Sequence, residues 1–124
     1  MFNFQKLDVW HDAIEFAEKV YEFSKSFPDA ERFGLTNQMR RAAAAVSANV
    51  AEGSSRSSRV EFARFIEMAT GSLFEVVSHA TIARKQELLS EGNYDVLFAA
   101  AEKQSKMLSG LRRSLIHKKA HANG

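Results

Sequence analysis

Two histidine–glutamate pairs are the residues in this sequence that could ligate a metal ion. They are His11 with Glu15 and Glu75 with His79, and within each pair the residues are four positions apart. A di-iron helical bundle instead needs two Glu-x-x-His motifs and a glutamate from each of two other helices. The chain has no Glu-x-x-His motif, and it has no cysteine for zinc or an iron–sulfur cluster. We therefore expect no metal site and no cofactor.

A run of serines around Arg56, from Ser54 to Ser58, offers several hydroxyl groups. A serine nucleophile needs an adjacent base, and the sequence places none beside this run. The preceding Gly53 does not begin a phosphate-binding loop, because the Gly-x-x-x-x-Gly-Lys spacing is missing. With no cysteine available as a thiol nucleophile either, we expect a protein that is not an enzyme.

Two groups of basic residues could contact phosphates. One lies around the second expected helix and the turn that follows it, and the other lies at the end of the fourth expected helix: Arg40, Arg56, Arg59; Arg112, Arg113, Lys118, Lys119. Such side chains would bind nucleic acid without reading its sequence, and the affinity would depend on salt. The alternative is that the second group only complements a helix C-terminus and a solvated end of the chain.

The net charge of +2 conceals blocks of opposite sign. Residues 1–35 have four Lys or Arg against seven Asp or Glu, and residues 65–92 have two against four. Residues 36–64 have five against two, and residues 93–124 have six against two. A basic block can neutralise phosphates, whereas an acidic block can dock a basic neighbour; an ordinary solvated mixture is the alternative.

A chain of 124 residues with 45% hydrophobic and 26% charged residues is typical of one globular domain. One proline and six glycines are too few for a sandwich or barrel with many turns. No apolar run approaches the length of about 20 residues needed for a membrane span. The first residues lead directly into charged, periodic sequence, so we also expect no signal peptide and a cytoplasmic location.

Apolar residues recur at helical spacing in four segments, which predicts an all-α, antiparallel up-and-down four-helix bundle over residues 1–117. The expected helices are 8–26, 36–52, 58–88 and 91–117. Asp8 and Ser58 are the expected N-caps, and Trp10 begins the core stripe of the first helix. Gly53 is the expected left-handed cap of the second helix. Residues 118–124 are expected to be a flexible basic tail.

The second and third helices each have another regular face, away from the core stripe. These faces contain small residues with isolated charges, and the candidate interface residues are Gln38, Arg41, Asn49, Glu52, Arg64, Gly71, Ser72 and Glu75. A glycine within a helix costs about 1 kcal/mol relative to alanine, which indicates a packing reason at Gly71. We expect both faces to be buried, either between the two helices or against another protomer.

A hairpin of these two helices would place Arg41 level with Glu75, and Glu52 within reach of Arg64. We expect both pairs to be in contact, the alternative being four exposed side chains. The chain also has ten phenylalanines. Phe74 and its neighbours widen the apolar side of the third helix, which indicates either a wide core or a partner surface.

Four motifs together resemble the bacterial four-helix bundle family encoded in intervening sequences of 23S rRNA genes. They are Phe4–Trp10, Phe33–Ala42, Ala48–Gly53 and Arg64–Glu75, and the resemblance covers residues 2–116. This family is similar to the accessory variability protein of diversity-generating retroelements. That similarity implies a homopentamer of four-helix protomers, with a reverse transcriptase and nucleic acid as partners.

The sequence thus leads to two functional hypotheses. The first is a homo-oligomeric bundle that binds RNA or DNA through its basic clusters. The alternative is an oligomeric scaffold for a protein partner, such as a reverse transcriptase, without direct contact to nucleic acid.

Overall fold

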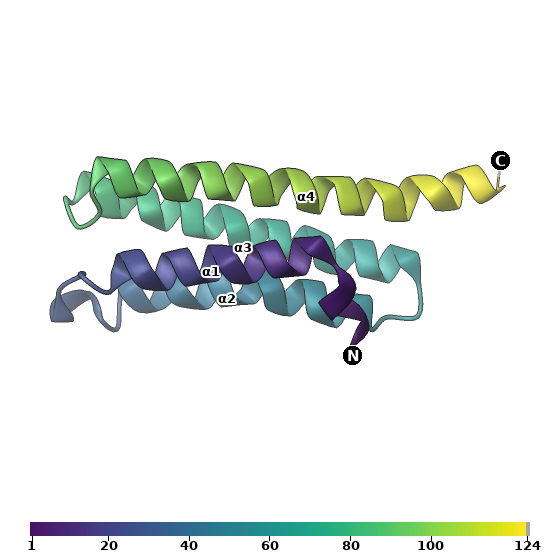
Figure 1. Ribbon diagram of the computed structural model, residues 1–124, viewed down its shortest axis with the longest axis horizontal. Coiled ribbons are helices and arrows are strands. Elements are labelled where there is room, and N and C mark those ends of the chain that lie inside the picture. Colours follow the sequence, from purple (N-terminus) through teal and green to yellow (C-terminus); the bar gives the residue numbers. More distant parts are fainter. Residues whose placement is uncertain (124) are drawn as a thin grey trace.

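The computed structural model describes residues 1–123, and the side chains of residues 1–116. Within residues 1–123 it contains four α-helices, two short 3-10 helices and no strand, which confirms the all-α class (Figure 1). The elements are η1 (Asn3–Lys6), α1 (Asp8–Ser24), η2 (Asp29–Glu31), α2 (Leu35–Ser54), α3 (Arg59–Lys85) and α4 (Glu91–Asn123).

Each α-helix packs against two others, in the cyclic order α1, α2, α3, α4. Short connections make consecutive helices antiparallel, so the pairs α1–α2 and α3–α4 form opposite sides of the bundle (Figure 1). Of the helices in residues 1–123, none combines the length and the apolar character that crossing a membrane requires.

The core is densest where α2 meets α3. The fully buried Val46 and Val50 of α2 lie in one cluster with Ile66, Leu73 and Val76 of α3. Each such side chain contributes about 1.5–3 kcal/mol when it leaves water. Buried alanines on both helices let the two backbones come close together, and they are Ala42, Ala43, Ala63, Ala69, Ala80 and Ala83.

The core stripe of α1 differs from the expected one. Ala13 and Val20 are buried, as helical spacing from Trp10 predicts, and Val9 and Phe16 are buried beside them, whereas Trp10 itself is only half-buried. The Trp10 ring lies 5.0 Å from the ring of Phe4 in η1. Trp10 therefore packs both against the core cluster and against the N-terminal segment.

The helix boundaries confirm one expected cap and contradict two. Ser58 caps α3, since its hydroxyl accepts a hydrogen bond of 3.1 Å from the Glu61 backbone N–H. Asp8 is wrong as an N-cap, because Leu7 occupies that position and Asp8 is the first helical residue. Gly53 is wrong as a left-handed cap: it lies inside α2, and no glycine in residues 1–123 has a positive φ.

Gly53 is instead a point of close approach between α2 and α3. A Cβ added to it would lie 2.7 Å from the Cβ of Phe65 and 2.9 Å from a ring carbon of Phe62. Real Cβ atoms do not come this close to other atoms, so α3 can pack here only against a residue without a side chain.

Both of the last two helices end differently from expectation. The third ends at Lys85 rather than residue 88, in a cap where the Leu88 N–H donates to the Ala83 carbonyl at 2.9 Å. This cap requires a left-handed residue, and Glu87 supplies it with a φ of 63°. Helix α4 ends at Asn123 rather than 117, and the expected tail, 118–124, falls outside the residues whose side chains are described.

A buried polar connection joins α1 to α4. The Gln104 side chain is completely buried, and its Nε2 donates a hydrogen bond of 2.6 Å to Oδ2 of Asp12. The other Asp12 oxygen lies 3.1 Å from Nζ of Lys103, and this contact raises the pKa of that lysine. The Gln104 Nε2 finds this acceptor only in one register of the two helices, so the contact helps to fix how α4 sits against α1, although the buried Gln104 Oε1 has no hydrogen-bond partner among the described residues.

Candidate interaction surfaces

The candidate interface residues of α2 and α3 lie on one side of the bundle. A groove of about 350 Å³ runs between these helices, and it is lined by Gln38, Arg41, Ala42, Ala45, Ser72 and Glu75. Arg41 is therefore level with Glu75, as the hairpin predicts. Asn49 lies further along α2, half-buried, and its amide donates to the Ala45 carbonyl of its own helix at 2.9 Å.

The two expected charge pairs are wrong. Among the described side chains, no ion pair joins Arg41 to Glu75 or Glu52 to Arg64. Glu52 instead accepts a hydrogen bond of 2.8 Å from Arg56, one turn further along the chain, and Glu75 lies 3.9 Å from His79. A side chain one helical turn away is a neighbour on the same helix, so Glu52 and Glu75 contact partners within their own stretch of chain rather than across the two helices.

The residues of α3 that point away from the bundle form a stripe that is exposed in the single chain. We call this stripe the outer face of α3, and it consists of Arg64, Met68, Gly71, Glu75, Ser78 and Ile82. Met68 is 50% exposed and Ile82 is 48% exposed. A Cβ added to Gly71 would meet no atom within 4 Å. Of the two expected ways to bury this face, burial between α2 and α3 is wrong.

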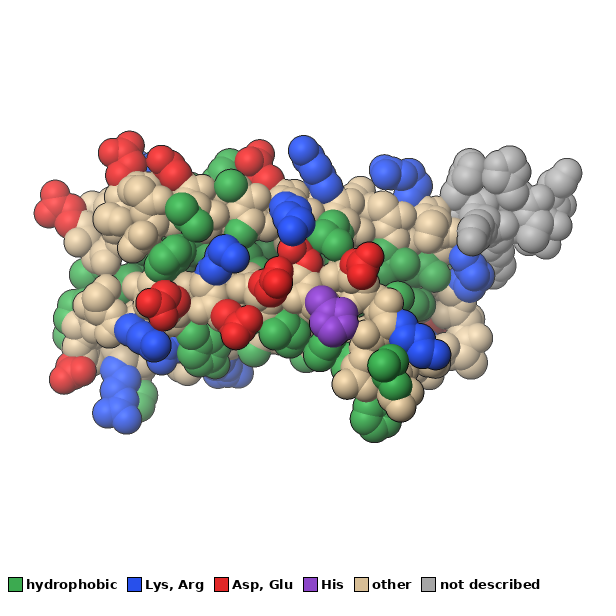
Figure 2. Space-filling view, in the orientation of Figure 1, with side chains coloured by type: hydrophobic (Ala, Val, Ile, Leu, Met, Phe, Trp, Pro, Cys, Tyr) green, Lys and Arg blue, Asp and Glu red, His purple; other side chains and the backbone are tan. Residues whose placement is uncertain are grey.

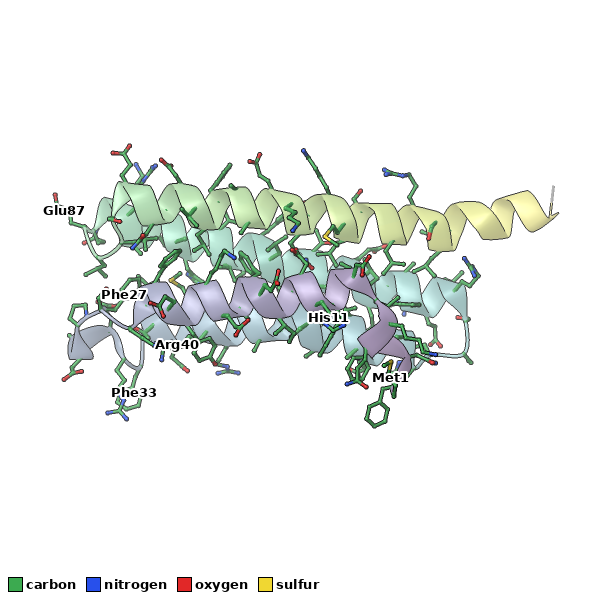
Figure 3. The ribbon with its side chains drawn as sticks, in the orientation of Figure 1. Met1, His11, Phe27, Phe33, Arg40 and Glu87 are labelled. Carbon is green, nitrogen blue, oxygen red and sulfur yellow. The ribbon has the colours of Figure 1, made fainter. Side chains whose placement is uncertain are left out.

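Arg40 lies apart from Arg56 and Arg59, the other two members of its basic group. Its guanidinium donates to the Ser24 hydroxyl at 2.9 Å and lies 4.8 Å from the centre of the Tyr21 ring. Figure 3 shows it where α2 meets the end of α1, about 20 Å along α2 from the α2–α3 turn. The structure therefore does not bring Arg40 together with Arg56 and Arg59.

The remaining described arginines of the two basic groups meet at one end of the bundle. Arg59 donates to the carbonyls of Ser114 and Leu115, both at 3.2 Å, which brings the α2–α3 turn beside α4. We call this group the arginine end, and it consists of Arg56, Arg59, Arg112 and Arg113. The side chains of Lys118 and Lys119 lie outside the described residues.

Most of the arginine end is already bound to the chain itself. Arg56 pairs with Glu52 and stacks over the Phe65 ring at 4.6 Å. Arg112 donates to Glu67 at 2.8 Å, and Arg113 is exposed. On the face that contains α1 and α4, acidic and basic side chains are intermingled (Figure 2). Fewer donors remain for phosphate than the number of arginines indicates.

A second groove lies on the opposite flank of α3, between α3 and α4. It has a volume of about 320 Å³, and we call it the α3–α4 groove. Its floor is apolar, with Leu73, Val77 and Ala101, and its walls include Phe74, 59% exposed, and Phe98, 41% exposed. Glu102 and Lys106 of α4 lie at its edge.

Sequence patterns did not identify this groove. Phe98 follows the buried Leu97, and periodicity alone assigns both to the same apolar side of the helix. The surplus of phenylalanines is the available signal, and Phe74 on the third helix locates one wall of the groove, but no pattern shows that Phe98 of α4 lies beside it. Among the described residues, no group of three or more His, Asp or Glu side chains could hold a metal ion.

The fold and surfaces define a class: an all-α four-helix bundle with apolar side chains left exposed on α3 and beside α4. Residues 5–110 match the family described as 23S rRNA-intervening sequence protein, so the chain belongs to that family.

The fold is shared with solved structures, and one of these is similar over most of both chains. It is a protein of unknown function from the S23 ribosomal protein family of Bacteroides thetaiotaomicron, with a TM-score of 0.75 and 19% sequence identity. The match covers 85% of this chain and 98% of that chain. No curated protein matches the sequence.

Proposed function

We propose that the protein is a non-enzymatic bundle that associates with further copies of itself through the outer face of α3. The exposure of this face in the single chain supports the proposal. Met68 and Ile82 present apolar side chains to solvent on either side of Gly71, which is open and has no packing partner in its own chain. A face of this kind gains free energy when another copy covers it.

Gly71 also has a cost that its own chain does not explain. A glycine within a helix destabilises it by about 1 kcal/mol relative to alanine. An assembly gives a reason, because a residue without a side chain lets a helix of another copy come close. Five copies is the number that the family resemblance implies.

The replacement of Gly71 with leucine tests the proposal. A leucine there would hold a neighbouring copy away, so we expect Gly71→Leu to lower the mass of the assembly measured by light scattering. Gly110→Leu is the matched control, since Gly110 is another helical glycine with no atom within 4 Å of an added Cβ. If Gly71→Leu assembles as well as Gly110→Leu, the outer face of α3 is not the contact.

Nucleic-acid binding at the arginine end is a second candidate function. The contact between Arg59 and the α4 carbonyls supports it, because this contact gathers the four arginines at one end. In an assembly the group would be repeated once per copy, and several weak sites would act together. The self-contacts of Arg56 and Arg112 limit the affinity expected for each copy.

A gel-shift titration with rRNA fragments and duplex DNA, at low and at physiological salt, tests this second function. We expect Arg113→Gln to weaken binding. The control is Lys25→Gln, which should leave binding unchanged because Lys25 is exposed and follows the C-terminal end of α1, at the opposite end of the bundle from the arginine end. No shift at low salt would contradict nucleic-acid binding. A scaffold for a protein, such as a reverse transcriptase, should instead retain that protein after nuclease treatment.

A further inference from the structure

Phe33 is an aromatic side chain that the fold leaves uncovered. It lies in the connection between η2 and α2 and is 84% exposed. Figure 3 shows it pointing away from the bundle at the end where α2 begins. The guanidinium carbon of Arg32 lies 5.3 Å from the centre of its ring. The connection thus presents an aromatic ring with a cation on it.

The α3–α4 groove has the matching character. Its floor and walls are apolar, and its edge has one acidic and one basic side chain, Glu102 and Lys106, on successive turns of α4. Arg32 beside the ring could face Glu102. Glu31 is half-buried and accepts a hydrogen bond of 3.4 Å from the Leu35 N–H of its own chain, so the cation beside Phe33 is the charge that remains to be paired. This cation is complementary to the carboxylate at the edge of the groove.

The two features lie on opposite sides of the molecule, because Phe33 belongs to the α1–α2 side and the groove to the α3–α4 side. Phe33 therefore cannot reach the groove of its own chain. We infer that Phe33 of one copy inserts into the α3–α4 groove of the next copy, with Arg32 against Glu102. This inference rests on the self-association proposed above.

A contact between two different patches is heterologous, so every copy offers one Phe33 and one groove. Such contacts close into a ring or continue as a filament. The groove also adjoins the outer face of α3, since Phe74 of its wall precedes Glu75 of that face. One neighbour could therefore cover both.

The loss of the ring side chain is the first test. We expect Phe33→Ser to raise the concentration at which the assembly half-dissociates by at least about tenfold, as for a central aromatic contact. The fold should tolerate the change because the side chain is exposed. Phe2→Ser is the matched control, an aromatic residue that is 71% exposed at the N-terminus. If Phe2→Ser dissociates the assembly and Phe33→Ser does not, Phe33 is not the side chain that occupies the groove.

A charge exchange tests the orientation. Arg32→Glu and Glu102→Arg should each weaken the assembly, because each places like charges together. The double variant should restore it. If the double variant assembles no more strongly than the weaker of the two single variants, Arg32 does not pair with Glu102.

Disulfide formation between two variants tests the contact directly, because the chain contains no cysteine. A mixture of Arg32→Cys and Glu102→Cys should form a cross-linked heterodimer under mild oxidation, while a mixture of Lys19→Cys and Glu102→Cys should not. A wild-type monomer would refute both self-association and this contact. An assembly that is unaffected by Phe33→Ser and forms no cross-link would refute this contact alone.

Discussion

Gly53 and Gly71 are both helical glycines, and their surroundings are opposite. An added Cβ at Gly53 would collide with Phe65 and Phe62 of the facing helix, whereas one at Gly71 would meet nothing within 4 Å. Gly53 lies where α2 and α3 close against each other. Gly71 lies on the outer face of α3, which the described residues leave exposed.

The difference between the two glycines distinguishes a contact that one chain makes by itself from a surface that the single chain leaves exposed. The contact at Gly53 has its partner in the same chain, so the fold alone explains the residue. The glycine at position 71 lowers helix stability without a compensating contact in its own chain. Met68 and Ile82 are exposed on the same face, and this supports the proposal that another copy of the chain covers the outer face of α3.

The largest expected effect is at the closed position. Gly53→Leu would force a side chain against Phe62 and Phe65, and we expect it to lower the free energy of unfolding by about 3 kcal/mol. Urea unfolding followed by circular dichroism measures this change. An unchanged midpoint would mean that α2 and α3 can separate here at little cost, and the comparison with Gly71 would fail.

The α1–α4 contact provides a second test of the closed interior. Asp12→Ala removes the carboxylate that binds Gln104, and it leaves the buried amide with one weaker contact, to the Val9 carbonyl at 3.4 Å. We expect a loss of about 2 kcal/mol in unfolding free energy. Lys103→Met is the control and should cost well under half as much, because that side chain is exposed. Equal losses would assign the effect to the ion pair instead.

At Gly71, a small substitution should raise the free energy of unfolding rather than lower it. Gly71→Ala adds a methyl group into open space, so we expect the free energy of unfolding of the isolated chain to rise by about 1 kcal/mol. The same variant should assemble more weakly than wild type. Unfolding at a dilution where the variant is monomeric separates the two effects. A destabilised monomer would show that Gly71 already has a packing partner in its own chain.

The smallest expected change in the free energy of unfolding is at Glu87, where the backbone has a conformation that favours glycine. Glu87→Gly would relieve the strain of a left-handed residue with a side chain, at φ 63°. We expect a gain of about 0.5–1 kcal/mol in unfolding free energy, because glycine also loses more entropy on folding. Thermal unfolding would measure it, with Glu91→Gly as a control that should not gain stability.

Much of this fold could be predicted from local pattern. Helical periodicity located all four helices, and the Ser58-x-x-Glu61 spacing located a cap that the structure confirms. The shared groove of Arg41 and Glu75 follows from the same geometry, since each lies about four helical turns from the connection between α2 and α3.

The errors arose where the answer depended on the distance between elements. Gly53 resembles a helix cap in sequence, and only the approach of Phe65 shows that it is a contact. The partners of Arg59 lie 55 and 56 residues away, and no local pattern contains them. The buried Gln104 donates its Nε2 hydrogen bond to Asp12 of another helix, and a pattern within one helix cannot reveal that acceptor.

The central claim is that the outer face of α3 is covered by another copy of the chain. Light scattering behind size exclusion on the wild-type protein tests it most directly. We predict a mass that is a multiple of 13.9 kDa, falling toward that value in Gly71→Leu. A wild-type mass of one chain at every concentration would contradict the claim.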